Sequence, residues 1–159
     1  MNEERNVSEP IVVFNKNVRT SELNELFKEF QGDIIVNGNL ILNEKKLVIK
    51  CDNLYVTGGI SMSINNTDVC VIGNLYVGDD IDCCNINVNG SICCTGCISS
   101  LEIDIAEDLY CENGIDTCGY DMNVGGEVVC NDDIAAAEIV VLKKIYVKST
   151  IEADSISVG

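Results

Sequence analysis

The sequence predicts an all-β protein, a single-stranded, right-handed β-solenoid of about seven coils of about 17 residues each. Two observations predict this fold. First, the chain read from Val69 in lines of about 17 residues gives VCVIGNLYVGDDIDCCN, INVNGSICCTGCISSLE and further lines of the same pattern. Second, apolar residues recur within a line at positions 1, 3, 7, 9 and 13, with a small residue at 15. This period of two residues is typical of strands, and three short strands in each repeated line build a solenoid.

The repeat extends over residues 32–159. The later lines are IDIAEDLYCENGIDTCGYD, with two extra residues near Cys118, then MNVGGEVVCNDDIAAAE and IVVLKKIYVKSTIEADS. Upstream, 47–68 is the same line with insertions, and 34–46 is a shortened one. The strands follow one another at steps of about six, six and five residues, which predicts a roughly triangular coil. Because no coil buries its own inner face, the coils must stack at about 4.8 Å and pair each strand with its neighbours.

Stacking places equal line positions in columns along the axis. Positions 9 and 15 point inward, where a narrow core favours small residues and a free cysteine packs as a small hydrophobe. The inward columns are Val77, Cys94, Cys111, Cys130 and Val147, and Cys83, Ser100, Thr117, Ala136 and Ala153. The outward columns, at positions 8 and 14, are Tyr55, Tyr76, Cys93, Tyr110, Val129 and Tyr146, and Asp82, Ser99, Asp116, Ala135 and Glu152. The four tyrosines therefore share one outer face, where they either support strand stacking or form a contact surface.

Residues 1–31 do not fit the repeat and predict an N-terminal cap. IVVF at 11–14 predicts a strand, and the apolar spacing over 21–30 predicts a helix that Thr20 or Ser21 caps. Such a cap covers the core that an end coil exposes. The last coil ends as ISVG with no similar segment after it, so we expect an open C-terminal edge that pairs with a partner or with a second copy of the chain.

The charge is concentrated in the middle of the chain. The net charge is −16, and none of the ten Lys and Arg residues lies between Cys51 and Leu142, where 16 carboxylates and all ten cysteines lie. Over about five coils this is one negative charge per ~1.6 Å, close to the ~1.7 Å of duplex DNA. The sign excludes direct nucleic-acid binding. Two interpretations of the charge remain: it prevents aggregation of a strand-rich rod, or it attracts a basic partner.

The cysteines are expected to be free thiols that fill the core. Cys94-x-x-Cys97 is half of a zinc or redox motif, but the chain has no second CxxC and no histidine to complete a site. We therefore expect no metal and no cofactor. Ten cysteines beside a full apolar core favour a reducing, cytoplasmic location. The start MNEERN has no signal-peptide pattern and there is no run of 18 apolar residues, so no membrane association is expected.

The paired acids do not predict an enzyme. Asp79–Asp80 and Asp132–Asp133 have the residue types of solenoid glycosidases and lyases. Both pairs fall at a corner of the coil, where polar turn residues are needed in any case. Solenoid acyltransferases need a catalytic histidine, which is absent, and both arginines lie before the repeat. We expect a non-enzymatic protein.

Two stretches carry a family resemblance. GNLYVGDDI at 73–81 and INVNGSICCTGCI at 86–98 are similar to the short, glycine-punctuated coils of bactofilins, which are polymer-forming bacterial β-helix proteins. The resemblance covers roughly residues 33–159. It implies a self-assembling structural scaffold, joined through exposed terminal coils.

The charge pattern predicts a different function, that of an acidic binding protein. Such a protein occupies a basic surface of a nucleic-acid-handling protein or a toxin and inhibits it, in the manner of a nucleic-acid mimic. The acidic contact residues would be Asp79, Asp80, Asp104, Asp108, Asp116, Asp132 and Asp133. The aromatic contact residues would be Tyr55, Tyr76, Tyr110 and Tyr146. The bactofilin-like scaffold remains the alternative.

Overall fold

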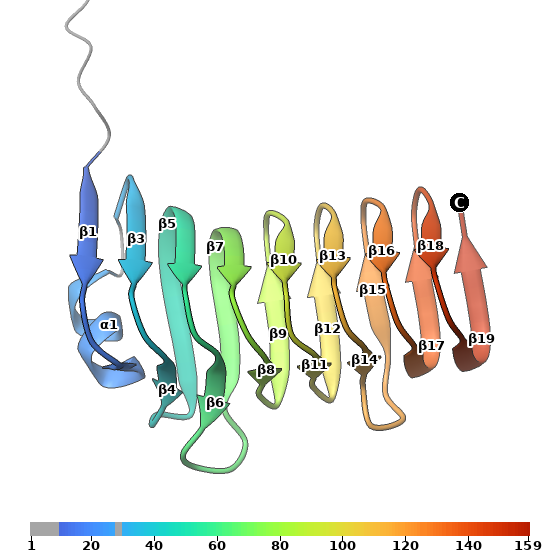
Figure 1. Ribbon diagram of the computed structural model, residues 1–159, viewed down its shortest axis with the longest axis horizontal. Coiled ribbons are helices and arrows are strands. Elements are labelled where there is room, and N and C mark those ends of the chain that lie inside the picture. Colours follow the sequence, from blue (N-terminus) through green and yellow to red (C-terminus); the bar gives the residue numbers. More distant parts are fainter. Residues whose placement is uncertain (1–9, 28–29) are drawn as a thin grey trace, which may run out of the picture.

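A computed structural model describes residues 10–27 and 30–159 and shows coils stacked along one axis (Figure 1). Its described part holds 19 strands and one short helix, and all the strand pairs are parallel. The predicted β-solenoid is confirmed. It has about eight coils rather than seven, because residues that were predicted as a separate cap form a coil of their own.

The first of the three faces is here named the tyrosine face, after its outward side chains. Each of its strands pairs in register with the next, so residues of equal position stack along the axis. Its strands are β1 (Ile11–Phe14), β3 (Asp33–Val36), the ends of β5 (Lys46–Val56) and β7 (Asp68–Val77), β10 (Ile92–Cys94), β13 (Leu109–Cys111), β16 (Val128–Cys130) and β18 (Ile145–Val147).

The second face, named the short-strand face, has mostly strands of two or three residues. They are β2 (Val18–Arg19), β4 (Leu40–Leu42), β6 (Ile60–Met62), β8 (Ile81–Asp82), β11 (Ile98–Ser99), β14 (Ile115–Asp116) and the starts of β17 (Ile134–Val141) and β19 (Ile151–Val158). Their shortness follows from the sequence, which offers only two inward positions per coil on this side.

The third face is named the cap face because the helix α1 (Thr20–Leu26) takes the place of a strand in its first coil. The remaining coils contribute the starts of β5 and β7, β9 (Asn85–Val88), β12 (Glu102–Ile105), β15 (Met122–Val124) and the ends of β17 and β19.

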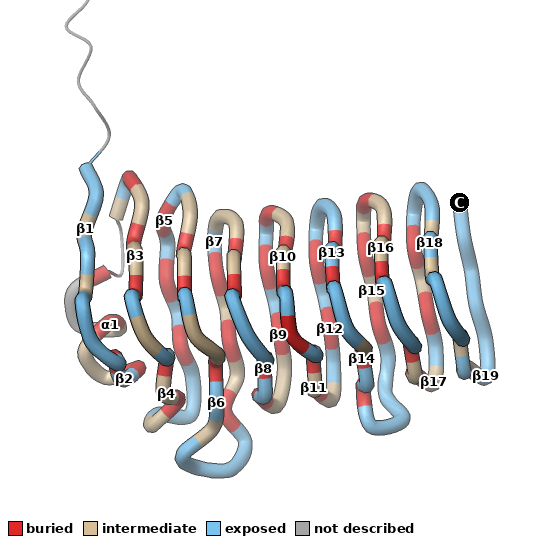
Figure 2. Tube along the Cα trace, in the orientation of Figure 1, coloured by how far each residue is buried: buried red, intermediate tan, exposed pale blue. Residues whose placement is uncertain are grey.

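The core is a continuous apolar column inside the three faces, and the predicted inward columns are buried except at Val147 and Ala153, near the C-terminal end, which are partly buried. Cys94, Cys111 and Cys130 are at most 1% exposed, and Ser100 and Thr117 are equally buried. Isoleucine and valine fill most other inward positions, each contributing roughly 1.5–3 kcal/mol when fully buried. Figure 2 shows the buried positions recurring coil after coil and disappearing in the last coil.

The helix differs from the prediction in length and in capping. It spans Thr20–Leu26 instead of 21–30; residues 28–29 lie outside the described residues, and the backbone N–H of Phe30 bonds to the Lys50 carbonyl at 3.2 Å. Neither Thr20 nor Ser21 caps it. The Thr20 hydroxyl instead donates to the Ile41 carbonyl of β4, because its side chain is buried against that strand.

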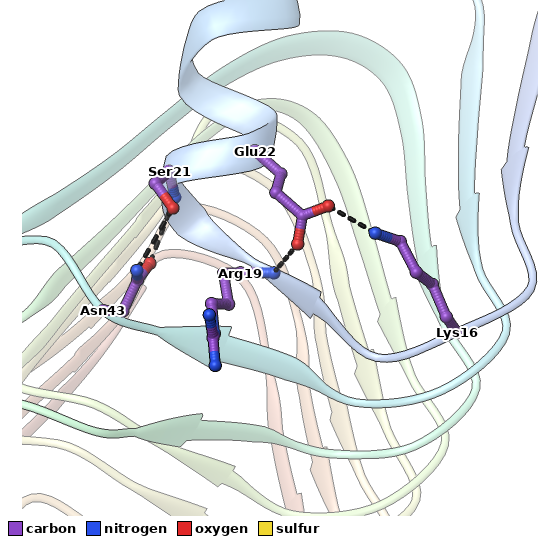
Figure 3. Close-up of polar contacts among 5 residues, drawn as sticks. All are labelled: Lys16, Arg19, Ser21, Glu22 and Asn43. Atoms are coloured by element: carbon purple, nitrogen blue, oxygen red, sulfur yellow. Dashed lines mark hydrogen bonds and ion pairs between the residues drawn. The ribbon is translucent and has the colours of Figure 1, made fainter.

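Side chains of Asn43 and Glu22 accept backbone N–H groups at the start of the helix, as Figure 3 shows. Asn43, which follows β4, accepts the N–H of Ser21 at 3.1 Å, and the Glu22 carboxylate accepts the Arg19 N–H at 3.2 Å. The ion pair with Lys16 and the bond from the Arg19 N–H together lower the pKa of Glu22. At its other end the helix closes the strand edge of β5, where Asn24 bonds to the N–H of Val48.

Candidate functional site

One continuous feature of the outer surface is the outward column of the tyrosine face. Strand pairing places Tyr55, Tyr76, Cys93, Tyr110, Val129 and Tyr146 beside one another in consecutive coils, as predicted. Ile35 of β3 continues the column toward the first coil. No carboxylate interrupts the column between Ile35 and Tyr146, so one apolar and aromatic strip follows the axis over most of the molecule.

The tyrosine rings are ordered by the coil spacing. Tyr55 and Tyr76 are stacked, with ring centroids 4.7 Å apart and planes 13° apart, which matches the separation of neighbouring parallel strands. Partial burial, with smaller contributions from Asp33 and Tyr76, raises the pKa of Tyr55. Further along, the Tyr110 hydroxyl accepts a hydrogen bond from the Asn131 side chain at 3.3 Å, and Tyr110 and Tyr146 are 37% and 52% exposed.

Cys93 interrupts this ladder of rings. Its small, half-buried side chain lies between Tyr76 and Tyr110, in a hollow of about 290 Å³ that extends past Tyr110 to Val129. Burial raises the pKa of the Cys93 thiol, so it is neutral at pH 7. The other residues of the hollow are Ser91, Ile92, Asp108, Leu109, Glu127 and Val129.

The seven acids predicted as contact residues are not gathered on one face. Four lie at the corner between the tyrosine face and the short-strand face, in the links from β7 to β8 and from β16 to β17. Asp108 lies at the opposite corner, just before β13. Asp104 is on the cap face in β12, and Asp116 is on the short-strand face in β14. The corner acids are Asp79, Asp80, Asp132 and Asp133.

The corners give the tyrosine face an acidic rim on each side. Glu112 extends the first rim, and Glu107 and Glu127 extend the second beside Asp108. Within the described residues only two ion pairs form, Lys16–Glu22 and Lys144–Glu127, the latter at 3.8 Å. The rims therefore keep most of their negative charge and flank an uncharged aromatic strip.

Some of these acids also have a structural role that the sequence interpretation missed. Asp80 Oδ1 accepts the N–H of Cys97 in the next coil at 2.7 Å, and Asp108 accepts the N–H of Glu127 at 2.8 Å. Asp133 does the same for Thr150 at 2.9 Å. The hydrogen bonds from Ser149 and Thr150 lower the pKa of Asp133. Each bond ties one coil to the next at a corner.

The sequence does carry a signal for this arrangement. The accepting Asp or Asn lies over a glycine of the next coil, and the N–H that it accepts belongs to the residue after that glycine. A side chain on the glycine would collide with the acceptor oxygen. The pairs are Asn17–Gly38, Asn39–Gly58, Asn74–Gly90, Asp80–Gly96 and Asp108–Gly126.

The cysteine motif is divided between core and surface. Cys94 is buried with its thiol 3.8 Å from the carbonyl oxygen of Cys97, whose own side chain is exposed at the corner. The inner thiols donate to backbone carbonyls, Cys94 to Asp79, Cys111 to Gly96 and Cys130 to Asn113. In the described ranges, no three His, Cys, Asp or Glu side chains are arranged to hold a metal ion.

Comparisons of the chain with protein-family models, with curated proteins and with solved structures found no match. Within residues 10–27 and 30–159, we find no helix with the length and apolar surface needed to cross a membrane.

Proposed function

We propose that this protein is a non-enzymatic binding protein whose tyrosine face receives a basic segment of a partner protein. The observation that carries the proposal is the aromatic strip between two acidic rims. Stable interfaces commonly combine a centre rich in tyrosine with a polar, charged rim. Occupying the basic surface of a nucleic-acid-handling protein or a toxin in this way would block that surface.

The acids and the tyrosines have different parts in this mechanism. A net charge of −16 attracts a basic partner over about one Debye length and raises the rate of encounter. Once the partner is bound, the tyrosines supply apolar contact area at low entropic cost and interact through their ring faces with lysine or arginine. Charge at the rims therefore acts mainly on the association rate, and the strip acts mainly on dissociation.

The acids spread over the other faces do not support a continuous phosphate-like ribbon. Asp104 and Asp116 point away from the tyrosine face on two different sides. In this proposal they contribute only to the overall field, and Asp79, Asp80, Asp108, Asp132 and Asp133 lie next to the partner.

The proposal is tested with a short synthetic peptide of alternating serine and lysine, measured by stopped-flow at low and high salt. The double variant Asp79→Asn/Asp132→Asn replaces one acid of each corner pair and should slow association several-fold at low salt. The matched control Glu102→Gln/Asp104→Asn removes the same charge from the cap face and should slow it less. Equal effects of the two double variants would contradict a binding surface on the tyrosine face.

A second pair of variants tests the aromatic strip. Tyr76→Ala/Tyr110→Ala should raise the dissociation rate of the peptide by about tenfold or more. The control Tyr120→Ala removes an exposed tyrosine that lies outside the column, between β14 and β15, and should leave the rate unchanged. An unchanged rate in the double variant would contradict the proposal.

A second candidate is the bactofilin-like scaffold, favoured by strand edges at both ends. In the described part of the chain, β18 and β19 pair on one side only, and so do β1 and β2. The last coil also exposes apolar side chains, with Ile156 at 48% and Val158 at 45%. Sedimentation at rising concentration tests this: filaments would support the scaffold, and a single small species would contradict it.

A further inference from the structure

We propose that the hollow over Cys93 is a slot for the guanidinium group of an arginine in the partner, stacked between Tyr76 and Tyr110. The inference rests on the proposed function and deepens it, because it names the side chain that the tyrosine face selects. Nothing in the proposed function itself requires arginine rather than lysine.

The strand register sets the size of the slot. Tyr76 pairs with Cys93, and Cys93 pairs with Tyr110, so the two tyrosines are two coils apart. At the strand spacing this places them about 9.5 Å apart along the axis. A planar group at the level of Cys93, one coil from each tyrosine, would lie about 4.7 Å from each ring along the axis. The rings of Tyr55 and Tyr76, in neighbouring coils, stack at 4.7 Å, so this column already shows the separation that a flat group at the level of Cys93 would have from each tyrosine.

The floor and the walls of the slot are also suitable. Cys93 is small and neutral and leaves part of its interval open, within a hollow of about 290 Å³ that extends from Tyr76 past Tyr110 to Val129. Asp108 and Glu127 line the side of the hollow that faces the cap-face corner. Asp108 already accepts the N–H of Glu127, and Glu127 lies 3.8 Å from Lys144, yet each carboxylate has a second oxygen to offer.

This combination favours arginine over the other candidates. A guanidinium is flat and permanently charged, stacks on aromatic faces, and donates in its own plane to carboxylates at the edge of the stack. A lysine ammonium has the charge but not the planarity. An aromatic side chain of the partner has the planarity but brings no positive charge to the two carboxylates.

The other interruption of the tyrosine ladder, at Val129, is less suitable. There the Tyr110 hydroxyl accepts from Asn131, a residue of the same coil as Val129, so the Tyr110 ring is held toward that coil. The valine side chain is branched and fills more of its interval than a cysteine. The Cys93 interval therefore carries the inference.

The test compares three peptides in which serine alternates with one other residue: arginine, lysine or citrulline. Isothermal titration with the whole chain should show the arginine peptide binding about tenfold more tightly than the lysine peptide, and the citrulline peptide binding most weakly. Cys93→Tyr fills the slot and should abolish the preference for arginine. Cys93→Ala, which keeps the slot open, should preserve it, and Val129→Tyr controls for the added ring.

A second measurement uses the unmodified protein, so it does not require that any variant folds. Cys93 is itself a probe in the floor of the slot, and Cys97 is an exposed thiol at the next corner of the same coil. The arginine peptide should slow the alkylation of Cys93 by iodoacetamide, followed by peptide mass spectrometry, several-fold more than that of Cys97. The lysine peptide should slow both alike.

The outcomes separate the two proposals. If the arginine and lysine peptides bind equally, and Cys93→Tyr changes neither, the slot is refuted while a basic partner on the tyrosine face stands. If the citrulline peptide binds as tightly as the arginine peptide, the proposal that the slot selects a charged guanidinium is refuted. If none of the peptides binds at low salt, both proposals are refuted.

Discussion

Asp80 Oδ1 accepts the backbone N–H of Cys97 at 2.7 Å, although the two residues belong to different coils. The carboxylate lies directly against Gly96, the residue before that N–H. A surface acid that the charge pattern marks as a contact residue is thus also a tie between coils. Substitutions of such acids must therefore be interpreted with stability measured alongside binding.

The first prediction concerns this hydrogen bond. Asp80→Ala should lower the free energy of unfolding by about 1 kcal/mol, since it leaves the Cys97 N–H without its acceptor. Asp80→Asn retains an acceptor oxygen and should lose less. Urea denaturation followed by circular dichroism measures both. The neighbouring variant Asp79→Ala is the control, and equal losses at the two positions would show that the bond does not stabilise the fold.

The second prediction concerns the glycine beneath the carboxylate. A Cβ on Gly96 would come within 2.5 Å of the backbone of Asp79 and Asp80, so Gly96→Ala must push two coils apart. We expect a loss of about 2 kcal/mol. Gly114→Ala is the matched control at the same corner, because its nearest contact would be 3.4 Å from the Asp133 carbonyl. Similar thermal midpoints for the two variants would contradict the close approach.

These two positions show what the sequence could predict and what it could not. Alternation of period two places Cys94 and Cys111 in one inward column, because side chains of a strand have only two directions. The role of Asp80 depends on a partner about one coil away, and an Asp before a strand is also what any turn would contain. The sequence does contain the pattern of an Asp or Asn followed about one coil later by a Gly. Only the stacking of the coils shows that this pattern marks a hydrogen bond between them.

The N-terminal coil was harder to predict for a related reason. β1 and β2 are separated by a loop and lack the regular spacing of the later lines, so periodicity did not include them in the solenoid. Their pairing with β3 and β4 is a tertiary relationship. The helix was predicted too long because apolar residues at helical spacing continue through Phe30, whose N–H bonds to Lys50 beside the strand edge instead.

The third prediction concerns acid. Hydrogen bonds from Ser149 and Thr150 lower the pKa of Asp133 in the folded protein. A carboxyl group with a lowered folded pKa stabilises fully above its unfolded pKa of about 3.9, and this contribution is lost as pH falls through the folded pKa. Asp133→Asn should therefore be less stable than the parent chain at pH 7, and the difference should shrink as the pH falls below about 3.9 and through the lowered folded pKa. A stability difference that does not vary with pH in urea titrations would contradict the assignment.

The fourth prediction concerns the ten thiols, which the structure divides into three classes. Cys97 and Cys118 are exposed, three cysteines are partly exposed, and five are buried. Burial raises the pKa of Cys51 and Cys83 to about 12, and hydrogen bonding with Cys130 and Cys94, together with burial, raises that of Cys111. Hydrogen bonding with Cys111 instead lowers the pKa of Cys94, and that of Cys130 to about 7, so burial alone protects these two thiols. Because the reagent must reach the sulfur and the thiolate is the reactive form, iodoacetamide at pH 8 should label Cys97 and Cys118 first, the intermediate class more slowly, and the buried class only when urea unfolds the coils. Time-resolved peptide mass spectrometry gives the order of labelling.

One outcome would contradict the closed core that stacks these thiols. If Cys94, Cys111 or Cys130 were labelled at the rate of Cys97 in the native protein, the coils would have to open locally.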